Sequence, residues 1–446
     1  MCLSISTDGA HACTVHAHGA DGRLLRVRAQ LRRLAAPPPE GAAPPAGPKG
    51  VAGVRQPRRA LPAHRARHGV LMHLRLGSFH AVVASAAGAA RLVLKTHDLA
   101  FADRPPTAAG EVGSYGYLGI VHTPHGAYWR MARRLCATEL FSARRVDSFE
   151  HVRAQEMRAL ARGLFERAGG GGGAVAVREH LARATLRNIL RMAVGEKWSG
   201  CYGGADGEAF RRTLNEAFAV TGAVSNAGWL NVQGFVRRMK KLYEVYDRFY
   251  EQILDEHEEE RRRAGAGEFA ARDLVDMLLQ LAEEGTPESE ARLTRDGVKA
   301  FIQDHHRRRH GELCGYDVPA GARVLVNAWA VARDPASWPD EPGAFRPERF
   351  LGGGAAAAGV DVRGAHFQLL PFGAGRRMCP AHGLVMKVVA AGVATLVHGF
   401  AWRLPDGVAP EEVSMEEHVG LSTRRKVPLL AVAEPRLPAH LYAAAD

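Results

Sequence analysis

The segment Pro371–Pro380, PFGAGRRMCP, places one cysteine, Cys379, at the end of a glycine-rich loop that carries two arginines. An apolar stretch with helical character, 384–398, follows it. Glycines let the backbone fold closely around a sulfur atom, while positive charge and the N-terminus of a helix favour the ionised thiolate. The segment therefore predicts a metal-binding thiolate or, as the plainer alternative, a buried free cysteine. Arg377 is placed to pair with a carboxylate of a bound cofactor.

The remaining cysteines give no sign of a disulfide framework. No two of the six lie at Cys-x-x-Cys spacing, and six in 446 residues are too few for a stapled secreted fold. This sparse use predicts a reduced compartment, and it predicts that a cysteine with a special role acts alone. The six are Cys2, Cys13, Cys136, Cys201, Cys314 and Cys379.

The net charge of +12 favours partners that carry negative charge. A basic surface suits nucleic acid, an acidic lipid or an acidic protein, but no nucleic-acid-binding motif supports the first choice. No apolar run reaches about 18 residues, and the best stretch, Leu384–Val397, is interrupted by Lys387. We therefore expect no membrane-spanning helix, and the N-terminus lacks the apolar core of a secretory signal.

Two parts of the chain differ in character. Residues 1–69 contain the proline-rich stretch Pro37–Gly50 and an Arg/His-rich stretch without periodicity, which predicts an irregular or disordered segment with a proline-rich hinge. Residues 70–446 are interpreted as one domain. Within it, alternating apolar residues on both sides of Gly77–Ser78 predict a β-hairpin over 72–84.

Helical periodicity dominates the domain, so the predicted fold class is mainly α with small β-sheets. Helices are expected over 126–168, 235–253 with a solvated end at 258–263, 293–304 and 384–398, and strands over 324–326 and 426–432, with a hairpin feature at 316–321.

The cysteine segment resembles the haem-binding loop of the cytochromes P-450, F-x-x-G-x-R-x-C, through Phe372, Gly375, Arg377 and Cys379. This pattern is highly specific. The resemblance implies that Cys379 is the thiolate ligand of the iron in haem b (iron protoporphyrin IX), with the other three residues around the cofactor.

Further segments agree in order and spacing with the same family. Trp129 and Arg133 have the W-x-x-x-R spacing of a motif whose two residues contact a haem propionate, and FRPERF (Phe345–Phe350) resembles the PERF segment. His305, eleven residues before Tyr316, matches a family histidine that contacts a propionate. The resemblance covers roughly 70–304 and 305–443. Within the family, the sequence is similar to plant enzymes of the secondary-metabolism (A-type) clan.

The sequence departs from the family at Asp304–His305. The stretch A/G-G-x-D/E-T-[TS] that should follow the helix ending at Asp304 is absent, and with it the acid–alcohol pair of oxygen activation, so no catalytic residue is identified. The E-x-x-R helix is missing too, which would leave the PERF arginine, Arg349, without its charge partner; a buried arginine of this kind costs about 3–5 kcal/mol. The predicted fold is therefore a P-450 fold with an internal deletion at 304/305, either real or a gene-model error, and without an N-terminal anchor.

The resemblance implies a monooxygenase that inserts one oxygen atom of O2 into a hydrophobic plant metabolite such as a phenylpropanoid, flavonoid or terpenoid. Electrons would come from NADPH through a flavoprotein reductase. Family membership implies a monomer at the cytosolic face of the endoplasmic reticulum membrane, although a chain without the anchor could be soluble in the cytoplasm. Two alternatives stay open: a catalytically incompetent remnant with impaired haem binding, and a basic nucleic-acid-binding protein that uses the N-terminal Arg/His tract.

Overall fold

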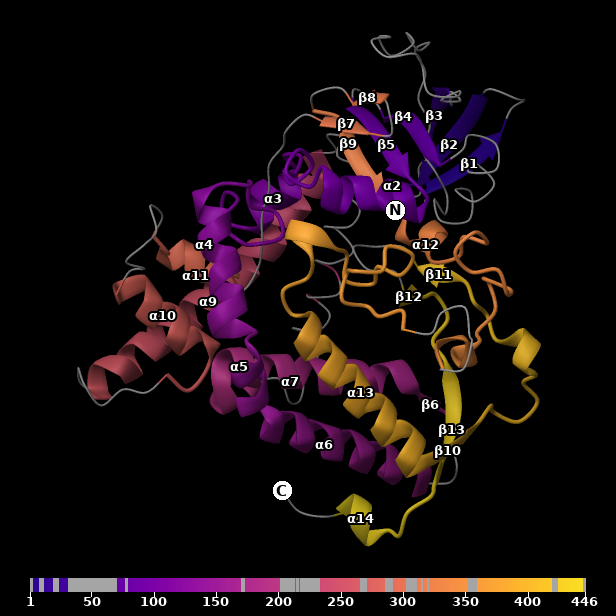
Figure 1. Ribbon diagram of the computed structural model, residues 1–446. Helices are drawn as coiled ribbons and strands as arrows, with labels where there is room; N and C mark the ends of the chain where they lie inside the picture. Colours follow the sequence, from indigo (N-terminus) through magenta and orange to yellow (C-terminus); the bar gives the residue numbers. More distant parts are fainter. Residues whose placement is uncertain are drawn as a thin grey trace.

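The computed structural model describes most of the chain after residue 70 and three short stretches before it (Figure 1). Helices dominate and the strands form sheets of two or three, which confirms the predicted fold class. The described residues are 3–7, 12–18, 24–30, 70–76, 79–169, 173–200, 213, 216, 233–264, 271–284, 292–301, 311–313, 316–318, 321–351, 359–418 and 424–443. The principal helices are α2 (Ala87–Arg91), α3 (Ala108–Gly113), α4 (Ala127–Leu135), α5 (Ala143–Ser148), α6 (Glu150–Gly169), α7 (Val177–Gly200), α9 (Gln233–Ala264), α10 (Leu274–Glu284), α11 (Arg295–Phe301), α12 (Ala328–Val331), α13 (His382–Gly399) and α14 (His440–Ala443).

The predicted hairpin over 72–84 is confirmed. Strands β4 (Leu71–Leu76) and β5 (Phe79–Ala84) pair antiparallel, and β9 (Arg323–Val326) pairs parallel with β5. Apolar residues of this sheet pack against α2, so the sheet and helix share one small core. The hairpin expected at 316–321 lies earlier in the chain: Tyr316–Val318 is the second strand, β8, and pairs antiparallel with β7 (Gly311–Leu313).

The N-terminal segment differs from the prediction of irregular structure over 1–69. Strands β1 (Leu3–Thr7), β2 (Ala12–His18) and β3 (Leu24–Gln30) form an antiparallel sheet. The alternation of apolar and polar residues in Leu24–Gln30 is a period-of-two strand signal that the composition of the segment obscured. The proline-rich hinge lies outside the described residues.

The expected helix over 126–168 is broken into several pieces. After α4 the chain makes one wide π-turn, Cys136–Leu140, and α5 starts anew where the Ser142 hydroxyl accepts a hydrogen bond from the Arg145 N–H at 3.3 Å. A serine that caps a new helix satisfies an otherwise unpaired backbone donor, which favours a break at this point. The periodicity of the apolar residues continues through the break and therefore did not reveal it.

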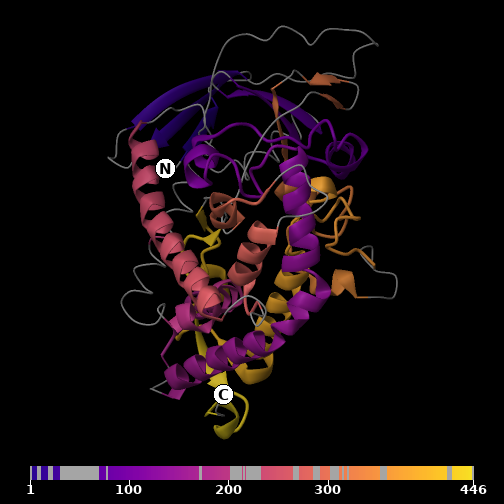
Figure 2. The ribbon, with the colours of Figure 1, turned by 90° about the vertical axis from the view of Figure 1, so that its left-hand side faces the viewer.

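Helices α4, α7, α9, α10 and α11 enclose the largest core (Figure 2). The apolar residues of α9 recur at steps of three and four, so one stripe faces inward; Met239, Ile253 and Leu254 are fully buried. The prediction over 235–253 with its end at 258–263 is confirmed, since α9 ends at Ala264. Residues 302–304 of the predicted helix 293–304 lie outside the described residues.

A second layer joins α6, α7 and α13 to a sheet of β6 (Val175–Ala176), β10 (Phe400–Arg403) and β13 (Leu430–Pro435). The expected strand over 426–432 begins later, at Leu430. Pro428 lacks a backbone N–H and cannot donate to the ladder, which delays the strand. Between β10 and β13 in sequence, β11 (Glu417–His418) and β12 (Arg424–Arg425) form a separate antiparallel pair.

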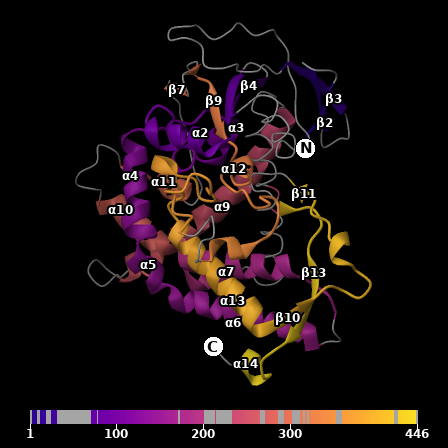
Figure 3. The same ribbon diagram turned by 45° about the vertical axis from the view of Figure 1, so that its right-hand side comes forward.

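Helix α13 begins two residues earlier and ends one residue later than the expected 384–398 (Figure 3). Its 18 residues have a mean hydropathy of 1.3, so by length and composition alone the helix could cross a membrane, whereas the sequence analysis set this stretch aside because of Lys387. Only 17% of it is buried. Leu384, Gly392 and Gly399 face the protein, and most of its valines face outward.

Arg349 of the PERF segment is not a stranded buried charge, contrary to the expectation. Its guanidinium donates to the carbonyl oxygens of Asp340 at 2.9 Å and Glu341 at 3.1 Å, and further to Ala344 and Arg346. The side chain lies near the surface, where water and carbonyls satisfy it. Among the described residues, Arg349 therefore has carbonyl acceptors in place of a carboxylate partner.

Candidate functional site

The loop before Cys379 has the backbone that its glycines predicted. Gly373 and Gly375 have φ values of +70° and +66°, which disfavour residues with a side chain. A Cβ atom at Gly375 would also collide with the carbonyl oxygen of Leu94, so this position requires glycine for two independent reasons. A short 3₁₀ turn, Gly375–Arg377, then leads to the cysteine.

Cys379 is a half-buried free thiol at the entry to α13. Its N–H donates to the Phe372 carbonyl at 2.9 Å, which closes the loop on itself. The N-terminus of α13 follows directly, and its unpaired N–H groups favour negative charge nearby. Ala381, where the family has glycine, has a φ of −89° and is therefore unstrained. These features suit a thiolate that binds a metal.

Arg377 connects the cysteine loop to a distant part of the chain. Its guanidinium donates to the carbonyl oxygens of Ala102 at 2.8 Å and Thr123 at 2.7 Å, and to that of Ile120 at 3.3 Å. It also lies over the buried ring of Trp129, 4.6 Å from the centroid. The predicted role of Arg377 was to pair with a cofactor carboxylate; the structure adds a role in holding the loop 102–123 against the cysteine loop.

Arg133 lies one turn after Trp129 on α4 and is a second cation of the site. Burial lowers the pKa of Arg133, and the nearby thiols of Cys136 and Cys379 act in the opposite direction. Within the described part of the chain, no carboxylate or carbonyl forms a hydrogen bond or ion pair with its guanidinium. A partly buried guanidinium without a partner fits the carboxylate of a bound group.

These residues share a pocket of about 280 Å³. Its walls combine cations with apolar side chains and one thiol, a set suited to a flat apolar ring system that carries acid groups and a metal. The lining residues are Arg104, Ile120, Val121, Trp129, Arg133, Pro371, Phe372, Arg377, Met378, Cys379 and Pro380. The thiol, the cations and the apolar walls fit the chemistry of haem, although the described cavity is large enough for only part of that molecule.

The pocket unites most of the predicted site and adds a residue that was missed. Trp129, Arg133, Phe372, Arg377 and Cys379 line it together, although the two groups lie 239 positions apart in sequence. Gly375 shapes the loop behind it, and His305 lies outside the described residues. Sequence reasoning missed Arg104, which follows Asp103 in FADRPP without a recognisable spacing to the other cations.

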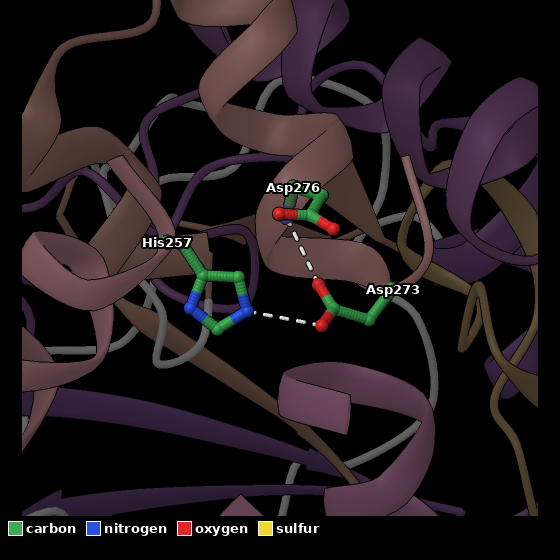
Figure 4. A group of neighbouring side chains, drawn as sticks. All are labelled: His257, Asp273 and Asp276. Carbon is green, nitrogen blue, oxygen red and sulfur yellow. Dashed lines mark hydrogen bonds and ion pairs between the residues drawn. The ribbon is translucent and has the colours of Figure 1, made fainter. Parts of the chain in front are cut away.

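A second cluster of titratable groups lies where α9 meets α10 (Figure 4). His257, Asp273 and Asp276 are buried, and their ligand atoms lie within 4.8 Å of one another, a set that could hold a metal ion. Hydrogen bonds already explain the arrangement: His257 Nδ1 donates to the Ile253 carbonyl at 2.8 Å, and Nε2 faces Asp273 Oδ2 at 3.0 Å. Burial alone would lower the pKa of His257, but the hydrogen bond and charge of Asp273 outweigh it and raise that pKa.

The carboxylates of this cluster also begin α10. Asp273 Oδ1 accepts the Asp276 N–H at 2.9 Å, and Asp276 accepts the N–H and the Nε–H of Arg272. Asp273 thereby caps the first turn of α10, and Asp276 satisfies the backbone N–H of the residue before the cap. The charges of His257 and Arg272 balance those of the two carboxylates, so the cluster acts as a structural junction.

Comparison with known proteins shows which family the chain belongs to. The model of the family described as Cytochrome P450 matches residues 37–306 and 303–430. The chain is 63% identical to trimethyltridecatetraene synthase of Zea mays, over 89% of each chain, and 62% identical to dimethylnonatriene synthase of Zea mays, over 90% of this chain and 93% of the relative. It is 31% identical to flavonoid 3'-monooxygenase of Arabidopsis thaliana, over 87% of this chain and 89% of the relative.

Solved structures agree on the fold. A zebra fish cytochrome P450 with progesterone has a TM-score of 0.65 at 20% identity and covers 85% of this chain and 99% of its own. The alignment with the first maize relative spans 498 positions, whereas 89% of 446 residues is about 397, so about 100 aligned positions have no residue of this chain. The two stretches matched by the family meet at 303–306, where the sequence predicted a joint.

Proposed function

Because this chain belongs to the cytochrome P450 family and is a haem monooxygenase by that membership, we propose that its substrate is an acyclic, methyl-branched polyene precursor. The names of the two maize relatives, at 63% and 62% identity, describe acyclic hydrocarbons with methyl branches and several double bonds. The flavonoid-hydroxylating relative is only 31% identical. The twofold higher identity is the observation that favours a terpenoid-like substrate over a phenolic one.

The residues of the pocket have distinct roles in this proposal. Bound haem supplies oxygen activation, and Cys379 would be its thiolate ligand. The guanidinium of Arg133, with which none of the described residues pairs, would hold a propionate, and Arg104 lines the same pocket. Trp129 and Arg377 would keep the loop 102–123 against the cysteine loop, which fixes the edge of the pocket.

Electron supply and location follow from the family. We propose that an NADPH-dependent flavoprotein reductase delivers the electrons and that the protein acts as a monomer at the cytosolic face of the endoplasmic reticulum. The excess of basic residues suits an acidic reductase surface. Arg376, in the cysteine loop, is about half exposed and pairs with Asp98 at 3.0 Å, so it could contact such a surface.

The carbon-monoxide difference spectrum of the reduced full chain tests the haem-thiolate assignment. A Soret band at the thiolate position is expected, and Cys379→Ala should abolish it. Cys136→Ala is the matched control, because Cys136 is a buried free thiol near the same arginine but outside the pocket lining. A thiolate band that persists in Cys379→Ala, or disappears equally in Cys136→Ala, would refute the ligand assignment.

Product analysis tests the substrate class. The protein with a plant reductase and NADPH should convert acyclic terpenoid alcohols and leave flavonoids unchanged. The reverse preference would refute the substrate proposal and leave the haem assignment intact.

One observation favours a second candidate, a haem-binding chain that does not turn over. The described pocket walls come only from residues 104–133 and 371–380, and about 100 positions of the maize relative have no counterpart. In that case the thiolate band appears, but NADPH oxidation does not respond to substrate.

A further inference from the structure

The segment between α3 and α4 contains three consecutive residues with a left-handed backbone, which we call the left-handed turn. Tyr115, Gly116 and Tyr117 have φ values of +50°, +63° and +78°. Glycine adopts such values readily, whereas each tyrosine is strained there. Strain of this kind persists only where the surrounding contacts fix the backbone, and it is common at elements that bind ligands. The contacts that hold this turn are therefore of functional interest.

The left-handed turn leads directly into the wall of the haem pocket. Ile120 and Val121 line that pocket, three and four residues after the turn ends. Arg377 fixes the far end of the segment, because its guanidinium binds the carbonyl oxygens of Ile120 and Thr123. The near end is the turn itself. Its conformation therefore decides where the two apolar side chains stand in the pocket wall.

Lys299 of α11 and Asp247 of α9 hold the left-handed turn through Tyr115. The ammonium group of Lys299 lies 4.6 Å from the centroid of the Tyr115 ring. It donates to Asp247 Oδ1 at 2.8 Å, and the Tyr115 hydroxyl donates to the same oxygen, also at 2.8 Å. A cation above an aromatic face and a shared carboxylate oxygen attract each other. The three side chains thus clamp the turn onto two helices.

Lys299 remains charged although its side chain is only 5% exposed. Burial alone would lower the pKa of Lys299, but its hydrogen bonds with Asp247, Glu251 and Asp296 outweigh burial and raise that pKa. Glu251 accepts at 2.5 Å, and Asp296 pairs at 3.0 Å. All three carboxylates are more than a third exposed, so water can solvate them if the lysine is replaced. A neutral replacement should therefore leave the fold intact.

Arg295, one turn before Lys299 on α11, separates the clamp from ordinary helix packing. It pairs with Glu251 at 2.7 Å, with Asp255 at 2.5 Å and with Glu258, all on α9. Arg295 and Lys299 thus join the same two helices. Among the interactions of the described residues, those of Arg295 reach α9 only, whereas Lys299 also reaches the left-handed turn.

We propose that Lys299 is a positioning residue for the haem pocket: it clamps the strained left-handed turn onto α9 and α11 and so keeps Ile120 and Val121 in the pocket wall. Lys299 is not one of the lining residues and acts through Tyr115 and Asp247. The effect on the segment stands on this geometry alone. The consequence for substrate binding rests on the proposed function.

Amide hydrogen exchange of the full chain as purified, followed by mass spectrometry, tests the clamp. Lys299→Met keeps the apolar stem and removes the charge, and it should speed exchange of peptides over 114–123 by at least about tenfold, because charged hydrogen bonds are lost. Lys299→Arg restores the charge and should recover most of the protection. Arg295→Met is the matched control and should change exchange over 114–123 by less than about twofold. Exchange that is unchanged in Lys299→Met, or that rises equally in Arg295→Met, would overturn the inference.

A second variant keeps the clamp testable if Lys299→Met does not fold. Tyr115→Phe removes only the hydroxyl that binds Asp247, and it should speed exchange over 114–123 by about threefold or more. No change in that variant would overturn the inference.

Kinetics test the consequence for the pocket. In the haem-loaded protein with reductase, Lys299→Met should raise KM for the acyclic terpenoid substrate at least about fivefold and change kcat by less than about twofold, since it alters binding and not the reacting group. Lys299→Arg should restore KM, and Arg295→Met should leave it unchanged. Faster exchange with an unchanged KM would refute the positioning role. Failure of the carbon-monoxide test with the exchange results intact would refute only the proposed function.

Discussion

The guanidinium of Arg377 stacks on the indole ring of Trp129, with its Cζ atom 4.6 Å from the ring centroid. Both residues match motifs for cofactor binding, yet they contact each other across 248 positions of sequence. Three carbonyl groups of the loop 102–123 bind the same guanidinium. One side chain therefore organises the edge of the haem pocket before any haem contact is considered.

Replacing Arg377 by alanine should destabilise the protein by about 2–4 kcal/mol, because three carbonyl oxygens lose a charged donor and Trp129 loses its stacking partner. Urea denaturation measures the loss. The neighbouring substitution Arg376→Ala is the control: it removes a largely exposed ion pair with Asp98 and should cost less than about 1 kcal/mol. Similar losses in both variants would contradict the organising role of Arg377.

Gly375→Ala should destabilise the cysteine loop more than Gly373→Ala does. Both positions have positive φ, so each substitution costs about 1–2 kcal/mol of backbone strain. Only at Gly375 does the new Cβ also meet the Leu94 carbonyl oxygen, whereas Gly373 faces open space. The two free energies of unfolding, measured side by side, would be equal if the contact with Leu94 had no influence.

Arg133→Gln should separate cofactor binding from stability. Because no described group pairs with this guanidinium and burial lowers its pKa, its removal should leave the haem-free protein equally stable or more stable. The same change should weaken haem binding, since a charged hydrogen bond contributes about 1.5–3 kcal/mol. Haem titration and denaturation of the haem-free form measure the two effects. Arg130→Gln, an exposed neighbour on α4, should change neither. A loss of stability without a loss of haem affinity would contradict the assignment.

His257→Gln should remove a pH dependence of stability. The folded state raises the pKa of His257, so its protonated pairing with Asp273 stabilises the protein fully below the unfolded pKa, about 6.5. This contribution is lost as pH rises through the folded pKa. Denaturation midpoints should therefore fall above about pH 6.5 in the parent and change less in the variant. Parallel pH profiles in the two proteins would show that the pair does not titrate as proposed.

Several features could be predicted from the sequence because their causes are local. The turn Gly77–Ser78 and the alternation around it produced the hairpin β4–β5, and steps of three and four produced α9. The break between α4 and α5 was missed, since the apolar period runs through it and only the capping of Ser142 marks the new start. Strands β1–β3 were missed because basic composition hid their alternation.

By itself, the sequence determined the chemistry of one loop. Two positive-φ glycines, two arginines and the start of α13 lie close to Cys379 in sequence. Backbone conformation and the position of a helix N-terminus depend mainly on residues that are near neighbours in sequence. The tertiary structure decided which distant groups satisfy those residues. A long guanidinium side chain can reach many acceptors. Only packing placed Arg377 against the loop 102–123, left Arg133 without a partner among the described residues and gave Arg349 carbonyl acceptors. Likewise, the apolar composition of α13 predicted a helix, but only the arrangement of its neighbours shows which of its faces no other element covers.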